Sequence, residues 1–185
     1  MSKESTLNLF RRLEQLNGIG AALSRERDIE RLLENILEAA KTITGADGGT
    51  LYSVTEDQSA LKFEILRTDS LGIRLGGTTG KAVDLPLLPL RTPDGAPNDS
   101  LIAAHAAIHD RTVNIADAYS AKGFDFSGTR AFDERTGYRS QSFLTVPMKN
   151  HDRELIGVLQ LINARDSETG AIIPFSQADQ SLAES

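Results

Sequence analysis

The stretch Glu154-Leu-Ile-Gly-Val-Leu-Gln-Leu-Ile-Asn163 decides the fold, because it is apolar on both faces of an extended chain. A strand of this kind is buried on both sides, so we place it in the centre of a sheet that helices cover on at least one face. Before it, Ser142-Phe-Leu-Thr-Val-Pro-Met148 is also typical of a strand, and the turn-forming residues Asn150-His-Asp-Arg153 separate the two. The two stretches predict a hairpin in the core.

A second hairpin is predicted nearer the amino terminus. Leu51-Tyr-Ser-Val-Thr55 and Leu61-Lys-Phe-Glu-Ile-Leu66 have the period of two that strands show, and Glu56-Asp-Gln-Ser59 forms the turn between them. The period changes from helical to extended just before this hairpin. We therefore expect a helix to lead directly into the sheet.

Two amphipathic helices are predicted ahead of that hairpin. Apolar residues recur at three and four positions from Leu9 to Leu23, and so narrow a stripe favours pairing with another helix. Asp28 is expected to cap the next helix, whose apolar face runs from Ile29 to Ile43 and which Gly45 ends.

The middle of the chain is rich in turns. Residues 69–100 hold many glycines and prolines and are predicted to form a long loop, with a short strand at Ala82-Val-Asp-Leu85. Ser100 is expected to cap a short helix over Leu101–His109, and Thr112–Ile115 predicts a brief strand.

The order of these elements predicts an α+β fold. We expect a central antiparallel sheet of about six strands, helices packed on its faces, and flanking helices at both ends. Phe175-Ser-Gln-Ala-Asp-Gln180 opens a helix within which the chain ends, so we expect one domain over residues 24–185 that is cut inside its last helix. Residues 1–23 are expected to form a signalling and dimerisation helix.

Composition excludes several classes of function. A formal net charge of -6 argues against a nucleic-acid partner, which clustered lysines and arginines would bind. The absence of cysteine removes disulfides, thiolate metal sites, cysteine nucleophiles and thioether-linked chromophores. Without a signal peptide or a long apolar run, we expect a cytoplasmic protein with no membrane partner.

Residues at both ends of the predicted domain resemble GAF domains. The run Gly157-Val-Leu-Gln-Leu-Ile-Asn163 followed by Phe175-x-x-x-Asp179 is similar to the end of a GAF domain. Asp28–Leu37 and Thr44-Gly-Ala-Asp-Gly-Gly-Thr-Leu-Tyr52 are similar to its first helix and strand, so the resemblance covers roughly residues 17–185. It implies a regulatory domain that binds a small molecule between the sheet and a lid and acts on an output domain.

A narrower resemblance concerns two loop segments. Asp69-Ser-Leu-Gly-Ile-Arg-Leu-Gly-Gly77 and Phe124-Asp-Phe-Ser-Gly-Thr-Arg-Ala-Phe-Asp133 resemble GAF domains that precede bacterial HD-type (HD-GYP-like) phosphohydrolase outputs. This likeness implies a bacterial signal-transduction protein, in which any phosphohydrolase or phosphodiesterase activity lies outside this chain.

Some cyclic-nucleotide-binding GAF domains carry an Asn-Lys pair followed by Phe-x-x-x-Asp-Glu. Ala164 cannot supply the ammonium of that signature and Gln180 cannot supply its last carboxylate, so the ion pair between them is missing. Arg165 is a partial replacement for the lysine. The departures weaken a cyclic-nucleotide assignment without excluding it. Three positions match and are expected to support the pocket: Asn163, Phe175 and Asp179.

The polar and aromatic segment between Asn114 and Ser142 corresponds to the lid of GAF domains. Aromatic rings there would stack on a planar ligand, aspartates would accept from its N–H groups, and Arg139 would meet an anion. Thr50, Tyr52 and Gln160 would form the floor. The alternative is that the segment only packs as an irregular lid. The lid candidates are Asp117, Tyr119, Phe126, Ser127, Phe132, Asp133, Thr136, Tyr138 and Arg139.

Two further stretches resemble a phosphate-binding loop and a metal site only in part. The stretch Leu75-Gly-Gly-Thr-Thr-Gly-Lys-Ala82 lacks the first glycine and the last hydroxyl of a phosphate-binding loop, so we interpret it as a turn. His105 and His109 lie on one face of a predicted helix and could supply half of a zinc or haem site. With only His151 left, in a distant predicted turn, we predict no metal and no cofactor.

Two functions remain open at this point. The first is a sensor of a small molecule, with cyclic nucleotides among the candidates, that forms a homodimer through its flanking helices and relays binding to an output domain. The second is a dimerisation and interaction module with a vestigial pocket. GAF proteins that reduce methionine sulfoxide use cysteine, which this chain lacks, so we expect no catalysis.

Overall fold

One antiparallel sheet organises the chain in the computed structural model, which describes residues 18–19, 22–23 and 28–185. The strands lie in the order β3-β2-β1-β7-β6-β5, and two short strands extend this path, β4 beside β2 and β8 beside β7. The predicted α+β class is confirmed, with eight strands in place of about six. The helix predicted over residues 1–23 lies mostly outside the described residues.

The two predicted hairpins form the middle of the sheet. β1 pairs with β2, β6 pairs with β7, and β1 and β7 lie side by side, all antiparallel. β7 is therefore central, as its apolar sequence predicts. The strands are β1 (Ala46–Val54), β2 (Ala60–Thr68), β3 (Ile73–Gly76), β4 (Leu88–Pro89), β5 (Val113–Ile115), β6 (Phe143–Lys149), β7 (Leu155–Arg165) and β8 (Ile172–Ile173).

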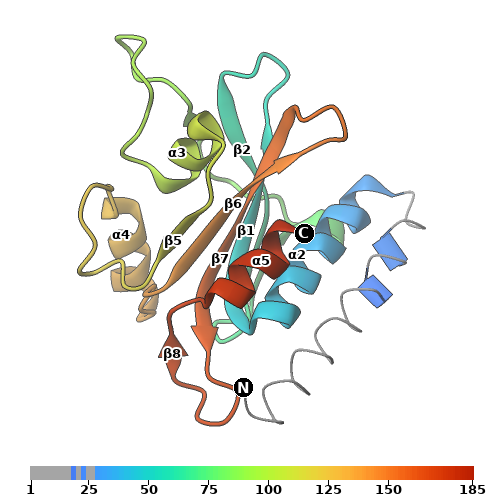
Figure 1. The fold of residues 1–185 in the computed structure, drawn as a ribbon, viewed down its shortest axis with the longest axis vertical. Helices are drawn as coiled ribbons and strands as arrows, with labels where there is room; N and C mark the ends of the chain where they lie inside the picture. The colour runs from blue at the N-terminus through green and yellow to red at the C-terminus, as the bar shows by residue number, and fades with distance from the viewer. Residues whose placement is uncertain (1–17, 20–21, 24–27) are drawn as a thin grey trace.

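Among the described residues, α2 and α5 cover one face of the sheet and α3 and α4 lie on the other (Figure 1). The helix α2 begins after Asp28, whose carboxylate accepts from the Arg31 backbone N–H at 3.2 Å, and ends at Gly45 with a left-handed φ of 71°. Both predicted ends of this helix are confirmed. The helices are α2 (Ile29–Thr44), α3 (Ile102–His109), α4 (Ser127–Thr136) and α5 (Gln177–Glu184), with a 3₁₀ turn η1 at Gly77–Thr79.

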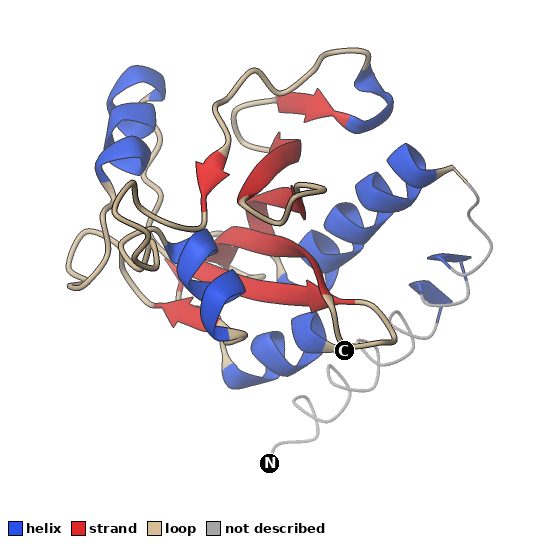
Figure 2. Cartoon of the chain, turned by 90° about the horizontal axis from the view of Figure 1, so that it is seen from above, coloured by secondary structure: helices blue, strands red, loops and turns tan. Residues whose placement is uncertain are grey.

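The larger apolar cluster lies between the sheet and the two helices α2 and α5, which cover one of its faces. Leu37 of α2 and Phe175, just before α5, are buried there against Leu51, Leu159 and Leu161 of the two central strands. The other face carries two smaller clusters, in which α3 and the segment before α4 pack on β1, β6 and β7. Seen from above, the helices surround the strands (Figure 2).

A bulge in β2 decides which of its residues face each side. Leu51 pairs with Ile65 whereas Tyr52 pairs with Phe63, so Glu64 is the extra residue. Ile65 consequently packs towards α2, while Phe63 lies beside Tyr52 on the opposite face. Strict alternation along the strand would place both on one face.

Three local predictions between residues 69 and 100 are wrong. The region is not a continuous loop, because a tight turn lets β3 pair with the free edge of β2, and β4 pairs with β2 further along. Ala82–Leu85 lies outside any strand. Ser100 does not cap α3: Leu101 holds the cap position, and the Ser100 hydroxyl donates to Asn98 Oδ1 at 3.3 Å.

Candidate ligand-binding site

A cavity of about 1060 Å³ opens on the face of the sheet away from α2. Strands β1, β2 and β7 form its floor, α4 and the residues around it form one wall, and β3 with residues 81–85 forms another. Leu101, Ile102 and Ala103, at the start of α3, close a further side. The volume is at the upper end of the range for small-molecule sites, so the space suits a ligand of nucleotide size.

The floor contains the three residues that the sequence assigned to it. Thr50 and Tyr52 of β1 and Gln160 of β7 all line the cavity, and Thr50 is the direct cross-strand partner of Gln160. The Tyr52 hydroxyl donates to Gln160 Oε1 at 3.4 Å, and Gln160 Nε2 donates to Thr145 Oγ1 at 3.1 Å. Burial raises the pKa of Tyr52 well above its ordinary value, so the hydroxyl stays a neutral donor.

Four lid candidates also line the cavity. Phe126 is buried at the start of α4, and the Phe132 ring meets the Tyr138 ring nearly edge-on at 6.3 Å between centroids. The Thr136 hydroxyl lines the same wall but is bonded back to the Phe132 carbonyl at 2.7 Å. Burial, with a hydrogen bond to the Asp47 carboxylate, raises the pKa of Tyr138. The lid therefore offers aromatic surface more than free polar groups.

The structure places the other lid candidates outside the wall of the cavity: Asp117, Tyr119, Ser127, Asp133 and Arg139. Asp133 is buried and accepts from the Ser140 hydroxyl and backbone N–H at 2.7 and 2.8 Å and from the Tyr119 hydroxyl at 2.5 Å. The Arg139 guanidinium lies over the Tyr119 ring at 4.1 Å, and Asp117 accepts from the Tyr119 N–H at 2.9 Å. These contacts all join residues of the lid segment to one another, so these side chains stabilise the lid.

Asn163 fixes the end of the lid to β7. Its Oδ1 accepts from the backbone N–H groups of Gln141 and Ser142 at 2.7 and 3.2 Å, and its Nδ2 donates to the Arg139 carbonyl at 2.8 Å. Asn163 has a left-handed φ of 59°, which asparagine tolerates better than most residues. It thus supports the pocket without lining it.

The other two signature residues position α5. Phe175 is 4% exposed and belongs to the larger apolar cluster. Asp179 forms a capping box with Ser176, because the Ser176 N–H donates to Asp179 Oδ2 at 2.8 Å and the Asp179 N–H donates to Ser176 Oγ at 3.1 Å. Gln180, where the signature has a glutamate, donates instead to Glu184 Oε1 at 3.0 Å.

Asp47 is a site residue that the sequence did not indicate. Its side chain is completely buried and accepts from the Tyr138 hydroxyl at 2.6 Å, from the Ser70 hydroxyl at 2.6 Å and from Arg165 Nη2 at 2.6 Å. Arg165 therefore pairs with β1. The carboxylate ties the lid, the β2–β3 turn and the end of β7 together, and no local pattern reports partners so distant in sequence.

Several lining residues of the floor strand β2 and of the wall formed by β3 and residues 81–85 were also missed. Phe63 and Leu66 of β2 and Leu75 of β3 line the cavity, as do Lys81 and Leu85 of the following segment. The bulge at Glu64 is what turns Phe63 and Leu66 to the same side. A continuous loop prediction for residues 69–100 could not reveal this wall.

The family of this chain follows from comparison with known proteins. The GAF domain family matches residues 28–185, which include the whole sheet and all four helices that frame it. The chain belongs to the GAF domain family. GAF domains are typically regulatory modules that sense small molecules. No helix in the described part of this GAF domain is long and apolar enough to cross a membrane.

Solved structures share the fold at low sequence identity. The GAF domain of an Acinetobacter phosphoenolpyruvate-protein phosphotransferase is 17% identical with a TM-score of 0.63, over 93% of this chain and 85% of that one. The free methionine-R-sulfoxide reductase from Neisseria meningitidis, solved with its substrate, is 17% identical with a TM-score of 0.61, over 99% of this chain and 87% of that one. These likenesses establish the fold alone.

One curated relative is similar over a shorter stretch. The dual 3',5'-cyclic-AMP and -GMP phosphodiesterase 11A of Takifugu rubripes is 42% identical over 66 residues, which are 36% of this chain. They are only 7% of that phosphodiesterase.

Proposed function

We propose that this GAF domain is a sensor that binds a small, planar, partly polar molecule between the sheet and α4, with cyclic nucleotides as the first class to test. The observation that carries the proposal is the cavity itself, about 1060 Å³ with aromatic rings on one wall and hydroxyl and amide groups on its floor. Aromatic surface with a few fixed polar groups is the usual composition of a small-molecule site.

The charges at the cavity suit a polar ligand. Arg74, Lys81 and Arg135 line it together with Asp84 and Asp125, and all five are exposed. Both signs are thus available to a ligand that carries an anionic group and N–H donors. The similarity to a stretch of a cyclic-nucleotide phosphodiesterase supports the same class, while Ala164 and Gln180 depart from the cyclic-nucleotide signature.

The structure offers a route from the cavity to the helices on the far face. Leu66, Arg67 and Thr68 of β2 all line the cavity, and the Arg67 guanidinium also donates to Glu34 of α2. A ligand that contacts this part of β2 would therefore act on a residue that also binds α2. Relay requires the ligand to favour one of two arrangements of these elements.

We further propose that the parent protein is a bacterial signalling protein with an HD-type phosphohydrolase output. The support is the resemblance of the segments 69–77 and 124–133 to GAF domains of that arrangement. In the structure, both segments contribute to the cavity wall. GAF domains that differ from this chain in these two segments would therefore also differ in the wall of the cavity, and so in the ligand that they bind.

The alternative function is a dimerisation module, and one observation favours it. α2 and α5 pack against each other on the face opposite the cavity (Figure 1), so the helix that opens the GAF domain and the predicted C-terminal flanking helix lie on one side. Paired helices on one side suit a two-fold interface. In this alternative the cavity has no ligand of its own.

Thermal unfolding in the presence of candidate ligands separates the two functions. A compound at a hundred times its Kd stabilises the folded state by about 2.7 kcal/mol, which raises Tm by roughly 5 to 10 °C at this size. We expect cyclic AMP, cyclic GMP or another planar nucleotide to produce such a shift. If no compound shifts Tm at saturating concentration, the dimerisation function is favoured.

Two variants at Thr50 provide the matched control. Thr50→Trp fills the floor of the cavity and is expected to abolish the shift, whereas Thr50→Val keeps the shape of the side chain and removes only its hydroxyl. Thr50→Val should retain most of the shift if the site is defined by shape. A shift that survives in Thr50→Trp would place the ligand outside this cavity.

A further inference from the structure

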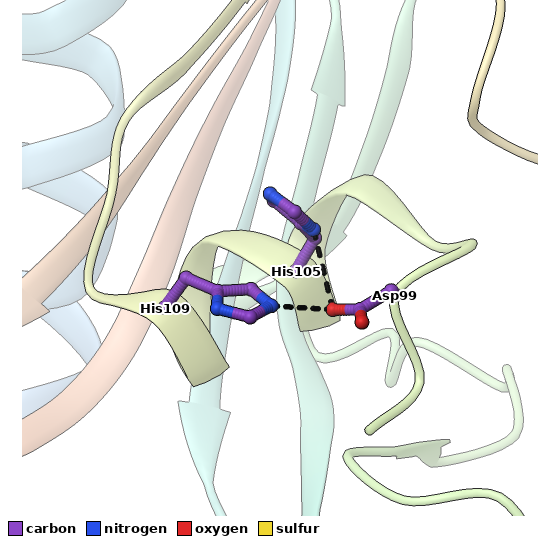
Figure 3. A group of neighbouring side chains, drawn as sticks. All are labelled: Asp99, His105 and His109. Carbon is purple, nitrogen blue, oxygen red and sulfur yellow. Dashed lines mark hydrogen bonds and ion pairs between the residues drawn. The ribbon is translucent and has the colours of Figure 1, made fainter. Parts of the chain in front are cut away.

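A cluster of two histidines and one aspartate lies along one face of α3 and the loop that leads into it (Figure 3). His109 Nε2 is 2.5 Å and His105 Nδ1 is 3.3 Å from the same oxygen, Asp99 Oδ1. Within the described residues, one ligand atom from each of the three side chains lies within 4.8 Å of the other two. Asp99 is the third partner that the sequence did not supply.

The fold brings these residues together by two separate means. His105 and His109 are one helical turn apart, so both project from the same face of α3. Asp99 comes from the loop that enters the helix, and Figure 3 shows one of its carboxylate oxygens facing both imidazoles. The Phe124 ring meets His105 edge-on, with centroids 5.3 Å apart, and restricts the rotation of that imidazole.

A hydrogen-bonding role alone leaves part of the cluster unexplained. A single carboxylate oxygen faces both imidazoles, and the buried Nδ1 of His105 has no hydrogen bond to any described residue. The contact of this nitrogen with Asp99 Oδ1 at 3.3 Å is not an aligned hydrogen bond, so a buried ring nitrogen is left incompletely satisfied. A cation held jointly by the three side chains would satisfy it.

We propose that Asp99, His105 and His109 form a binding site for a divalent transition-metal ion, with Zn²⁺ as the ion that best suits it. Two imidazole nitrogens and a carboxylate oxygen are a common zinc ligand set. In a tetrahedral zinc site, bonds of about 2.0 to 2.1 Å place ligand atoms roughly 3.3 Å apart. The separation of 3.3 Å at His105 already matches, and the 2.5 Å separation at His109 requires Asp99 to move slightly outward.

The surroundings allow that adjustment and leave room for a fourth ligand. The Asp99 side chain is 53% exposed and the His109 side chain 42% exposed, so the loop can shift and water can reach the ion. Three protein ligands with an open fourth position are typical of sites that exchange a ligand, in contrast to closed structural sites. Hard ions such as Mg²⁺ prefer all-oxygen ligands and are expected to bind poorly here.

The composition of the chain makes this proposal simple to test. There are no cysteines and only three histidines, and His151 is the one outside the cluster. Isothermal titration calorimetry of the full chain, freed of metal by a chelator, with ZnCl₂ is expected to show one ion per chain at micromolar affinity. Co²⁺ is expected to bind the same site and give the visible absorption of a four-coordinate ion.

Substitutions then assign the ligands. His105→Ala, His109→Ala and Asp99→Asn should each weaken Zn²⁺ binding at least about tenfold, and the double histidine variant should abolish it. His151→Ala is the matched control, because His151 is 89% exposed and lies beside a single carboxylate, Asp152 Oδ2, at 3.2 Å. Circular dichroism of each variant without metal confirms that it folds.

Three results would overturn the proposal. One is the absence of saturable Zn²⁺ binding below roughly 1 mM. Another is binding that the double histidine variant retains. The third is an equal loss in His151→Ala, which would show adventitious binding to surface histidines.

Discussion

Single buried polar residues hold the lid of this GAF domain against the sheet. Asp47 joins Tyr138 to Ser70 and Arg165, and Asn163 holds the backbone on either side of residue 140. Each of these side chains satisfies donors that come from distant parts of the chain. Removing one leaves buried donors unpaired, at a cost of about 1 to 3 kcal/mol for each group.

Asn163 provides a test of this role at the level of one residue. Asn163→Ala is expected to lower the free energy of unfolding by about 3 kcal/mol, because two N–H groups lose their acceptor and alanine must adopt a left-handed φ. Asn163→Gly loses the same hydrogen bonds but tolerates that φ, so it should be about 1 kcal/mol less destabilising. Urea unfolding measures both, and equal losses would show that backbone strain contributes nothing.

The ion pair between Glu34 and Arg67 makes stability depend on pH. Burial raises the pKa of Glu34, but hydrogen bonds from Thr78 and Arg67 together with the Arg67 charge outweigh burial, and the net pKa lies below the ordinary 4.5. A carboxyl whose folded-state pKa is depressed stabilises the protein above its unfolded-state pKa. That contribution is lost as pH falls through the folded-state value.

Glu34→Gln is therefore expected to be less stable at pH 7, by about 2 kcal/mol, because the fully buried Arg67 side chain loses its nearest charge. The difference between wild type and variant should shrink as the pH falls below about 4.5, because the carboxyl binds protons in the unfolded state before it does so in the folded state. Urea titrations at several pH values measure the difference. A gap that stays constant down to pH 3 would contradict a lowered pKa.

At the scale of elements, the face of the sheet that α2 and α5 cover holds the larger apolar cluster, and the other face holds the cavity. β1 approaches α2 so closely that a Cβ on Gly49 would lie 2.7 Å from Leu37 Cδ1 and 2.9 Å from the Gln160 carbonyl oxygen. Stability is thus concentrated on the face where no ligand is proposed to bind.

Substitution of Leu37 tests whether the face covered by α2 contributes most of the stability. Leu37→Ala is expected to cost about 3 kcal/mol, because the side chain is completely buried in the larger cluster. Ile29→Ala, on the same helix but 71% exposed, should change stability by less than about 0.5 kcal/mol. Thermal unfolding of both variants gives the comparison, and similar effects would show that α2 is not anchored through this face.

At the scale of the whole molecule, the sequence predicted what local periodicity encodes. The apolar run of β7, the alternation of β1 and the stripe of α2 each specify an element without reference to the rest of the chain. β3 and β4 carry no such signal, because they form by pairing with the edge of β2. The opposite error occurred at Ala82–Leu85, where the local pattern predicted a strand but the segment pairs with no neighbouring strand.

In the candidate site, too, the residues that could be predicted are those whose position follows from local periodicity. Thr50, Tyr52 and Gln160 could be placed because the face of a regular strand follows from its period. Asp133 resembles a ligand contact in sequence, yet its two oxygens are occupied by Ser140 and Tyr119. Asp47 acquires its partners Ser70, Tyr138 and Arg165 only through tertiary folding.

The most direct test of the account is to locate a bound ligand by NMR. Two-dimensional ¹H–¹⁵N spectra of the chain, titrated with cyclic nucleotides and planar fragments up to about 1 mM, report on every backbone amide at once. We expect at least one compound to give saturable shifts at Thr50, Gln160 and α4, and we expect Thr50→Trp to abolish them. No saturable shift from any compound, or shifts that persist in Thr50→Trp, would contradict ligand sensing by this cavity.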